Sequence, residues 1–186
     1  ANANTNVSKM GQTFQYVAPV AGAMGYSIED TALAIGLMAN ACIKGEKAGT
    51  ALRSIFTRLA DPPKDAAEAI EKLGLSITNA DGSMRPLNDV MKDLRKSFAG
   101  LTQEQKVQIA SQLAGQEAMS GLLALVNASE EDYNKLAEAI GNADGASKKM
   151  SDTMLDNLSG KWTLFQSALD GVKISLGERF KPYLMD

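Results

Sequence analysis

The chain has 186 residues, of which 45% are hydrophobic, and its 19 basic and 22 acidic side chains leave a formal net charge of −3. This length and apolar content suit one folded domain, whereas the nearly balanced charge argues against binding a nucleic-acid backbone by bulk attraction. Because the chain has no histidine, it cannot supply a Ser-His-Asp triad, a Cys-His peptidase site or a His-bearing zinc site.

The first third of the chain predicts three helices. Apolar residues recur at helical spacing over residues 7–24, 28–43 and 46–59. The second segment is apolar nearly all round, which is typical of a helix buried at the centre of a bundle. Ser27 and Asp30 predict its N-terminal cap, and Gly45 follows its end. Cys42 falls on this segment, so we interpret it as a small packing hydrophobe rather than a nucleophile.

The period of the pattern changes after the third helix. Asp61-Pro62-Pro63 ends that helix, because proline lacks an amide donor and restricts the residue before it, and a short helix is predicted over 64–73. Residues 75–78 then alternate with period two, and turn residues follow at 79–82. This pattern predicts a small β-hairpin over residues 75–86 that leans on the helices.

Helical spacing returns after residue 86. It predicts helices over 87–98, 102–127 and 129–140, the second of them broken near Gly115 or Gly121. Thr102 with Gln105, and Ser129 with Asp132, have the spacing of N-terminal caps.

Residues 146–186 predict one long C-terminal helix. Its apolar residues, spaced three and four apart, describe a continuous seam: Leu158, Trp162, Phe165, Leu169, Val172 and Leu176. Such a seam favours packing on the bundle, with packing on a second copy or a flanking segment, as in coiled coils, as the alternative. The sequence leaves both interpretations open.

Together these elements predict a mainly α fold, a bundle of about seven to eight helices with one small β-hairpin and a long C-terminal helix. We expect one helical domain over residues 1–186, with possible subdivisions at 1–74, 75–86, 87–145 and 146–186. The longest uncharged run, Gly11 to Ile28, contains polar residues and a proline, so we predict no transmembrane span. The start, Ala-Asn-Ala-Asn-Thr-Asn, lacks the features of a signal peptide, and we expect a fragment of a longer chain.

Several motifs invite a chemical interpretation, and each has a simpler one. Asn-Ala-Asp-Gly occurs at 79–82 and 142–145, but a calcium loop would need an oxygen ligand where Ile77 and Ile140 stand, so both are interpreted as turns. Residues 45–49 lack the Gly-Lys-Ser/Thr ending of a phosphate loop. The acidic residues at 29–30 and 130–132 suit helix N-termini better than a glycosidase cleft. We predict no catalytic residue, metal site or cofactor.

The block from Gly45 to Arg53, Gly-Glu-Lys-Ala-Gly-Thr-Ala-Leu-Arg, resembles the core region of phage tail tape measure proteins. Further matching blocks stand in the family's order: Tyr16–Ala21, Gly25–Asp30, Leu73-Gly74, Asp81-Gly82, Gly115–Ala118 and Asn157–Gly160. The resemblance spans residues 5–186, and its candidate structural motif comprises Gly45, Ala48, Gly49, Thr50, Leu52 and Arg53. Physical chemistry alone also accounts for this block. It ends one helix, places a glycine at a close contact and begins a new amphipathic helix.

The resemblance implies a structural role. Tape measure proteins occupy the tail lumen, and their length sets how far the tail tube polymerises. The implied partners are other copies of the protein and the tail tube and tail assembly proteins, with no direct nucleic-acid contact and no membrane span. The implied location is the tail lumen of the virion, after assembly in the bacterial cytoplasm, with a prophage as the expected source.

Two alternatives to this role stay open. One is a helical binding or scaffold module, effector-like and unrelated to tails, which would share the pattern alone. The other is a cell-wall-degrading domain, although the segment lacks the residues expected for that chemistry.

Overall fold

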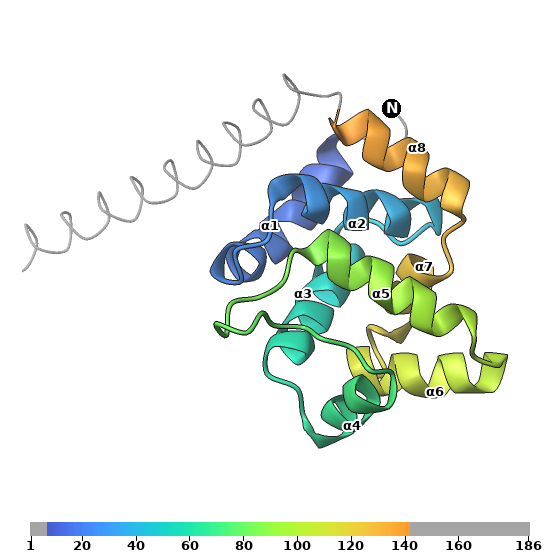
Figure 1. The fold of residues 1–186 in the computed structure, drawn as a ribbon. Coiled ribbons are helices and arrows are strands. Elements are labelled where there is room, and N and C mark those ends of the chain that lie inside the picture. Colours follow the sequence, from blue (N-terminus) through green and yellow to red (C-terminus); the bar gives the residue numbers. More distant parts are fainter. Residues whose placement is uncertain (1–6, 142–186) are drawn as a thin grey trace, which may run out of the picture. The chain divides into compact units, whose positions relative to one another are not determined.

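The structure, a computed structural model, describes residues 7–141, with side chains described from Met10 onward. These residues belong to one compact unit, Ala1–Ser147. Every regular element in this range is an α-helix, as Figure 1 shows. In chain order the helices are α1 (Val7–Ala23), α2 (Ile28–Asn40), α3 (Glu46–Ala60), α4 (Lys64–Lys72), α5 (Leu87–Ala99), α6 (Gln103–Ala114), α7 (Met119–Val126) and α8 (Glu130–Gly141). The predicted mainly α class is confirmed.

Helix α2 forms the centre of this unit. The nine consecutive residues from Thr31 to Ala39 are all buried, and α2 packs against α1, α3, α5, α7 and α8. Figure 1 shows α8 along one side of α2 and α3 on the other. Burying each large apolar side chain stabilises the fold by about 1.5–3 kcal/mol, so Leu33, Ile35 and Leu37 make α2 the main anchor of the core. The prediction of a helix apolar all round at the bundle centre is confirmed.

Helices α1 and α3 form the most extensive helix pair. Helix α1 buries Phe14, Val17 and Ala21, which are three and four residues apart. Helix α3 buries the residues of one face: Ala48, Gly49, Ala51, Leu52, Ile55, Phe56 and Leu59. Helix α6 then packs on α3, α4 and α7, and α5 packs on α2 and α7. The bundle therefore closes around α2 and α3.

The end of α2 differs from the prediction. The helix ends at Asn40 rather than near Ile43, and Cys42 is exposed with a φ of 63°. The Cys42 N–H donates to Ala39 O at 3.0 Å and the Ile43 N–H donates to Met38 O at 2.9 Å, which is the Schellman pattern for closing a helix. Glycine usually takes the left-handed place in this pattern, so a cysteine there gives no signal in the sequence. The interpretation of Cys42 as a buried packing residue is wrong.

The predicted β-hairpin over residues 75–86 is also wrong. One isolated antiparallel bridge, between Thr78 and Met84, forms there, and residues 7–141 contain no strand. The turn between them does form, since Gly82 has a φ of 84° and its N–H donates to Asn79 O at 3.0 Å. The turn predicted at 79–82 therefore forms, whereas the strands predicted on either side of it do not.

Two neighbouring residues keep this pairing short. Gly74, with a φ of 64°, follows the end of α4, and Pro86, which has no N–H to donate, is the N-cap residue of α5. The Arg85 side chain also fixes the loop, donating to Ser76 O at 2.6 Å and to Asp93 Oδ2 of α5 at 2.9 Å. The segment is thus held by its short backbone pairing, in which the Asn79 N–H donates to Ser83 O at 2.8 Å and the Arg85 N–H donates to Ile77 O at 3.0 Å, together with the Arg85 side chain.

The later helix boundaries follow the predictions more closely. The break falls at Gly115, which has a φ of 83°, whereas Gly121 stays buried inside α7. Thr102 and Gln105 form the reciprocal capping box at the start of α6. At the start of α8, the Asp132 N–H donates to Ser129 Oγ at 3.0 Å.

The predicted long helix over 146–186, with its seam from Leu158 to Leu176, lies outside the described residues. The proposed subdivision of the chain stays a prediction. Among the helices between residues 7 and 141, none combines the length and the apolar character that a membrane crossing requires.

Candidate interaction surface

Gly45, the first residue of the candidate motif, is buried and has a φ of 61°, a conformation that favours glycine. It is the N-cap residue of α3, and its carbonyl accepts a bond from the Gly49 N–H at 3.1 Å. The same carbonyl accepts a buried bond from Thr13 Oγ1 of α1 at 3.1 Å. Gly45 therefore starts α3 and ties that start to α1.

Gly49, one turn further along α3, lies against the backbone of α1. A Cβ built at this position would lie 2.5 Å from Tyr16 Cβ and 2.8 Å from Thr13 O. Neither atom is the free end of a flexible side chain, so neither can move aside without shifting α1 itself. Only glycine fits where the two helices approach each other in this way.

The remaining motif residues divide between two faces of α3. Ala48 and Leu52 are buried, with exposed fractions of 1% and 0%. Thr50 and Arg53 are exposed. Packing in the core therefore accounts for Ala48 and Leu52, whereas Thr50 and Arg53 have no packing role.

The exposed motif residues share one side of α3 with Glu46, since residues three and four apart on a helix are neighbours. Tyr16 of α1 lies beside them: it forms a side-chain hydrogen bond with Glu46 and lies within range of the Arg53 charge. We call Tyr16, Glu46, Thr50 and Arg53 the exposed strip. The nearby Glu46 carboxylate is the largest cause that raises the pKa of Tyr16, ahead of burial and the hydrogen bond to Glu46, while Arg53 acts in the opposite sense. An aromatic ring among mixed charges suits contact with another protein.

Two polar side chains of α3 cap the C-terminal end of α6. Ser54 Oγ donates to Ala114 O at 2.9 Å, and Arg58 Nη2 donates to Gln112 O at 2.8 Å. The last carbonyls of a helix have no partner within that helix, and a cation beside them also interacts favourably with the helix dipole. Arg58 additionally pairs with Asp65 in the first turn of α4 at 2.9 Å. One arginine thus joins α3, α4 and α6.

Arg95 of α5 makes the equivalent connection at the end of α7. Its guanidinium donates to Leu125 O at 3.1 Å and to Glu130 Oε1 of α8 at 3.0 Å. It also lies over the ring of Tyr133, 4.8 Å from the ring centroid. The Arg95 side chain is only 10% exposed, so these contacts replace most of its hydration.

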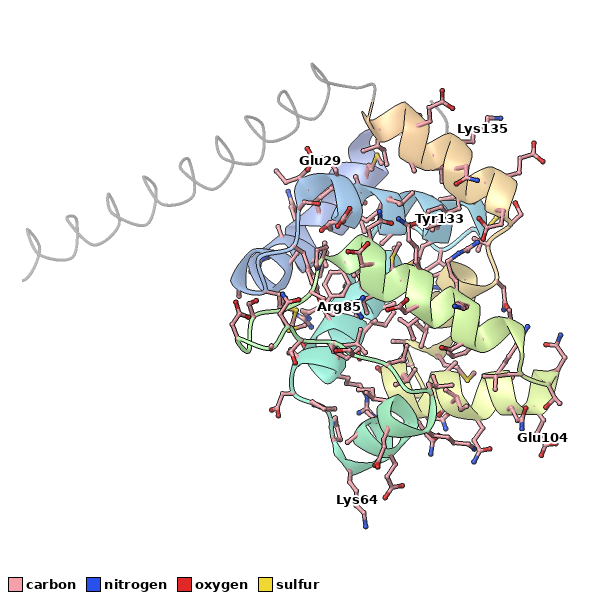
Figure 2. All side chains as sticks on the ribbon, in the orientation of Figure 1. Glu29, Lys64, Arg85, Glu104, Tyr133 and Lys135 are labelled. Atoms are coloured by element: carbon pink, nitrogen blue, oxygen red, sulfur yellow. The ribbon has the colours of Figure 1, made fainter. Side chains whose placement is uncertain are left out.

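Tyr133 extends this connection across α5 to α2. Figure 2 shows Tyr133 between α8 and α5, and its hydroxyl donates to Asn88 Oδ1 at the start of α5. The Asn88 N–H in turn donates to Asp30 Oδ2 of α2 at 3.1 Å. Burial is the largest cause that raises the pKa of Tyr133, and Arg95 acts against it. Polar contacts therefore run without a break from α2 through α5 to α8.

The acidic residues that could have suggested sugar hydrolysis lie at helix starts. Glu29 and Asp30 fall in the first turn of α2, and residues 130–132 fall in the first turn of α8, where the helix dipole favours negative charge. At the turn over 79–82, the Ser83 hydroxyl and N–H donate to Asp81 and hold the pKa of that carboxyl below its ordinary value. Within residues 7–141, no group of three His, Cys, Asp or Glu side chains could hold a metal ion. The second Asn-Ala-Asp-Gly lies outside the described residues.

Comparison with known proteins identifies the family of the chain. Residues 1–115 match the family described as phage-related minor tail protein. The chain belongs to this family. It is 42% identical over 184 residues to a tape measure protein of Pneumococcus phage Dp-1, and 34% identical over 170 residues to a "probable tape measure protein" of Escherichia phage P2. The resemblance to tape measure proteins expected from the motif blocks is confirmed.

The two relatives are much longer than this phage tail protein segment. The alignments cover 99% and 90% of the present chain but only 16% and 21% of the relatives. No solved structure matches the chain significantly.

Sequence reasoning missed the residues that connect helices in this tail protein: Arg58, Arg95 and Tyr133. In the sequence, Arg58 falls on the polar side of its helix. Its carbonyl partners lie 54 and 55 residues further along the chain, and the partner of Arg95 lies 30 residues further. No local pattern reveals contacts at that separation. The one available sign of the role of Arg58 was its position as a basic residue in the last turn of α3.

Proposed function

We propose that this chain is a segment of a tape measure protein that helps to set tail length during tail assembly. The observation that carries the proposal is the 42% identity to the tape measure protein of phage Dp-1 over 99% of this chain. Membership of the minor tail family supports the structural role in a tail. In this proposal the segment acts without catalysis and without a cofactor.

The proposed partners are other copies of the protein and the tail tube and tail assembly proteins. The proposed location is the tail lumen of the virion, after synthesis in the bacterial cytoplasm, with no direct contact to nucleic acid. Contacts through helical surfaces suit the described residues, because their regular elements are all helices. The seam at 158–176 is a second proposed contact surface, on sequence grounds alone.

The exposed strip is the best-placed contact surface among the described residues. Thr50 and Arg53 belong to the motif that resembles the family, and both are exposed. Packing accounts for the buried motif residues Ala48 and Leu52. A second role, contact with a tail protein, accounts for the exposed ones.

Tail length in the intact phage tests the ruler function. We expect in-frame deletion of this segment from the parent gene to shorten the tails seen by electron microscopy. A fully helical segment of 186 residues spans about 280 Å at 1.5 Å per residue, which is the shortening expected if the segment runs along the tail as helix. Tails of unchanged length would contradict a contribution of this segment to tail length.

Capture of tail proteins tests the contact surface. The chain, immobilised through a tag, should retain purified tail-tube or tail-assembly subunits, and the double variant Thr50→Ala with Arg53→Ala should retain less. The matched control is Glu68→Ala with Lys72→Ala, two exposed residues on α4. Equal retention by both double variants would remove the strip from the proposal, and no retention by the unaltered chain would favour the unrelated scaffold module.

A cell-wall-degrading activity is the weaker rival. It would lower the turbidity of a suspension of purified cell walls after addition of the chain. We expect no change, because the acidic residues considered for it lie at helix starts and turns.

A further inference from the structure

A hollow of about 610 Å³ opens beside α5, next to the residues that join α7 to α8. Four cationic side chains line it, namely Lys92, Arg95, Lys96 and Lys106, and Glu130 is the single carboxylate among its lining residues within the described part of the chain. The hollow is therefore locally positive in a chain whose formal net charge is −3.

The cations in this hollow differ in their partners. Arg95 is held by the carbonyl of Leu125 and by Glu130. Between residues 7 and 141, no ion pair involves Lys92, Lys96 or Lys106. Lys92 and Lys96 are one turn apart on α5, so they lie on the same side of that helix. The unpaired charge is thus gathered on one wall of the hollow, with Lys106 contributed by α6.

The existing ion pair indicates what the hollow binds. Glu130 belongs to the first turn of α8 and places its carboxylate 3.0 Å from Arg95. The hollow already accepts one carboxylate from an acidic helix start, and three cations beside it stay without one. A volume in this range accommodates several further side chains. We propose that this hollow binds a carboxylate-rich segment of a partner protein, its acidic side chains pairing with Lys92, Lys96 and Lys106.

A nucleic-acid backbone fits the hollow less well. Binding a backbone calls for cations in a row along successive phosphates, whereas these cations cluster at one place beside Glu130. The choice of a protein partner also rests on the proposed function, which assigns protein contacts to this segment. The positive charge of the hollow accordingly predicts that one such partner is acidic.

Fluorescence anisotropy with a short fluorescein-labelled peptide of alternating Glu and Ala tests the proposal on the full chain. The same peptide with Gln in place of Glu is the control ligand. We expect saturable binding of the Glu peptide that weakens as salt rises, and little binding of the Gln peptide. The double variant Lys92→Gln with Lys96→Gln should weaken binding about fivefold or more, since each exposed ion pair contributes modestly.

The matched control is Lys64→Gln with Lys72→Gln, which removes the same charge from α4. Figure 2 shows Lys64 at the periphery of the molecule, and its side chain is 91% exposed. Thermal melting of each variant checks folding, and Lys106→Gln replaces the double variant if that variant melts early. Equal weakening by the α4 control, equal binding of the Gln peptide, tighter binding of a DNA oligonucleotide, or no binding of the Glu peptide would each overturn the proposal. None of these results would alter tail length on deletion, so the two proposals fail separately.

Discussion

Gly49 in α3 and Tyr16 in α1 leave no room between them for a methyl group, because a Cβ on Gly49 would lie 2.5 Å from Tyr16 Cβ. We therefore expect Gly49→Ala to lower the free energy of unfolding by about 1–3 kcal/mol, the usual range for overpacking a close contact. Urea denaturation followed by circular dichroism measures this change.

Gly11→Ala in α1 is the matched control for that substitution. A Cβ on Gly11 would meet nothing within 4 Å, and alanine favours a helix over glycine by up to about 1 kcal/mol. This variant should be as stable as the unaltered chain or slightly more so. If both glycine variants changed stability alike, the close approach of α1 and α3 would not be the cause.

Arg58 supplies the second prediction, through its bonds to the end of α6. Arg58→Met should lower the free energy of unfolding by roughly 1–3 kcal/mol, because methionine keeps much of the stem while leaving the Gln112 and Leu113 carbonyls without a donor. Arg53→Met, on the exposed strip of the same helix, should change it by less than about 0.5 kcal/mol. Similar losses from the two variants, compared in the same denaturation assay, would rule out a specific capping role for Arg58.

A substitution at Cys42 should raise the free energy of unfolding, whereas Gly49→Ala and Arg58→Met should lower it. Its φ of 63° is strained for a residue with a side chain, so Cys42→Gly should raise the free energy of unfolding by roughly 0.5–1 kcal/mol. Cys42→Ala keeps the Cβ and should leave stability nearly unchanged. Thermal melting distinguishes the two, and a glycine variant that melted below the alanine variant would contradict the Schellman closure of α2.

Tyr26 links stability to pH. It packs edge-on against Phe56, with ring centroids 5.0 Å apart, its hydroxyl has no hydrogen-bond partner among the described residues, and burial raises its pKa to about 12. The unfolded chain releases this proton near the ordinary pKa of 10, two units earlier. The stability supplied by the neutral hydroxyl is therefore fully present below pH 10 and is lost between about pH 10 and pH 12.

Tyr26→Phe removes that dependence. At pH 7 the variant should equal or slightly exceed the unaltered chain in stability, because the buried hydroxyl forms no bond. By pH 11 the difference in favour of phenylalanine should grow by roughly 1 kcal/mol. Urea denaturation at the two pH values gives this difference directly. A constant difference between them would show that the Tyr26 hydroxyl titrates normally.

The sequence was a good guide wherever the controlling signal is local. The unbroken apolar run in α2 predicted a helix buried on every side, and Thr102 with Gln105 predicted the cap of α6. It failed where the outcome depends on a conformation or contact outside the local pattern. Cys42 takes a place that glycine usually marks, and the hairpin expected over 75–86 forms only the bridge between Thr78 and Met84.

The candidate surface likewise has one part that the sequence predicts and another part that depends on contacts between distant segments. The Gly45 to Arg53 block was visible as a pattern, and residue spacing alone places Glu46, Thr50 and Arg53 on one side of a helix. The contribution of Tyr16 comes from a different helix and depends on how closely α1 approaches Gly49. The hollow beside α5 depends likewise on α6 and α8, so spacing could not reveal its gathered lysines.

The two central helices are covered from opposite ends of the described range, α3 by α1 and α2 by α8. Removing α1 would expose the apolar face of α3, and removing α8 would expose part of α2, so either deletion would invite aggregation. Truncation at either end of residues 7–141 therefore destabilises the centre of the fold.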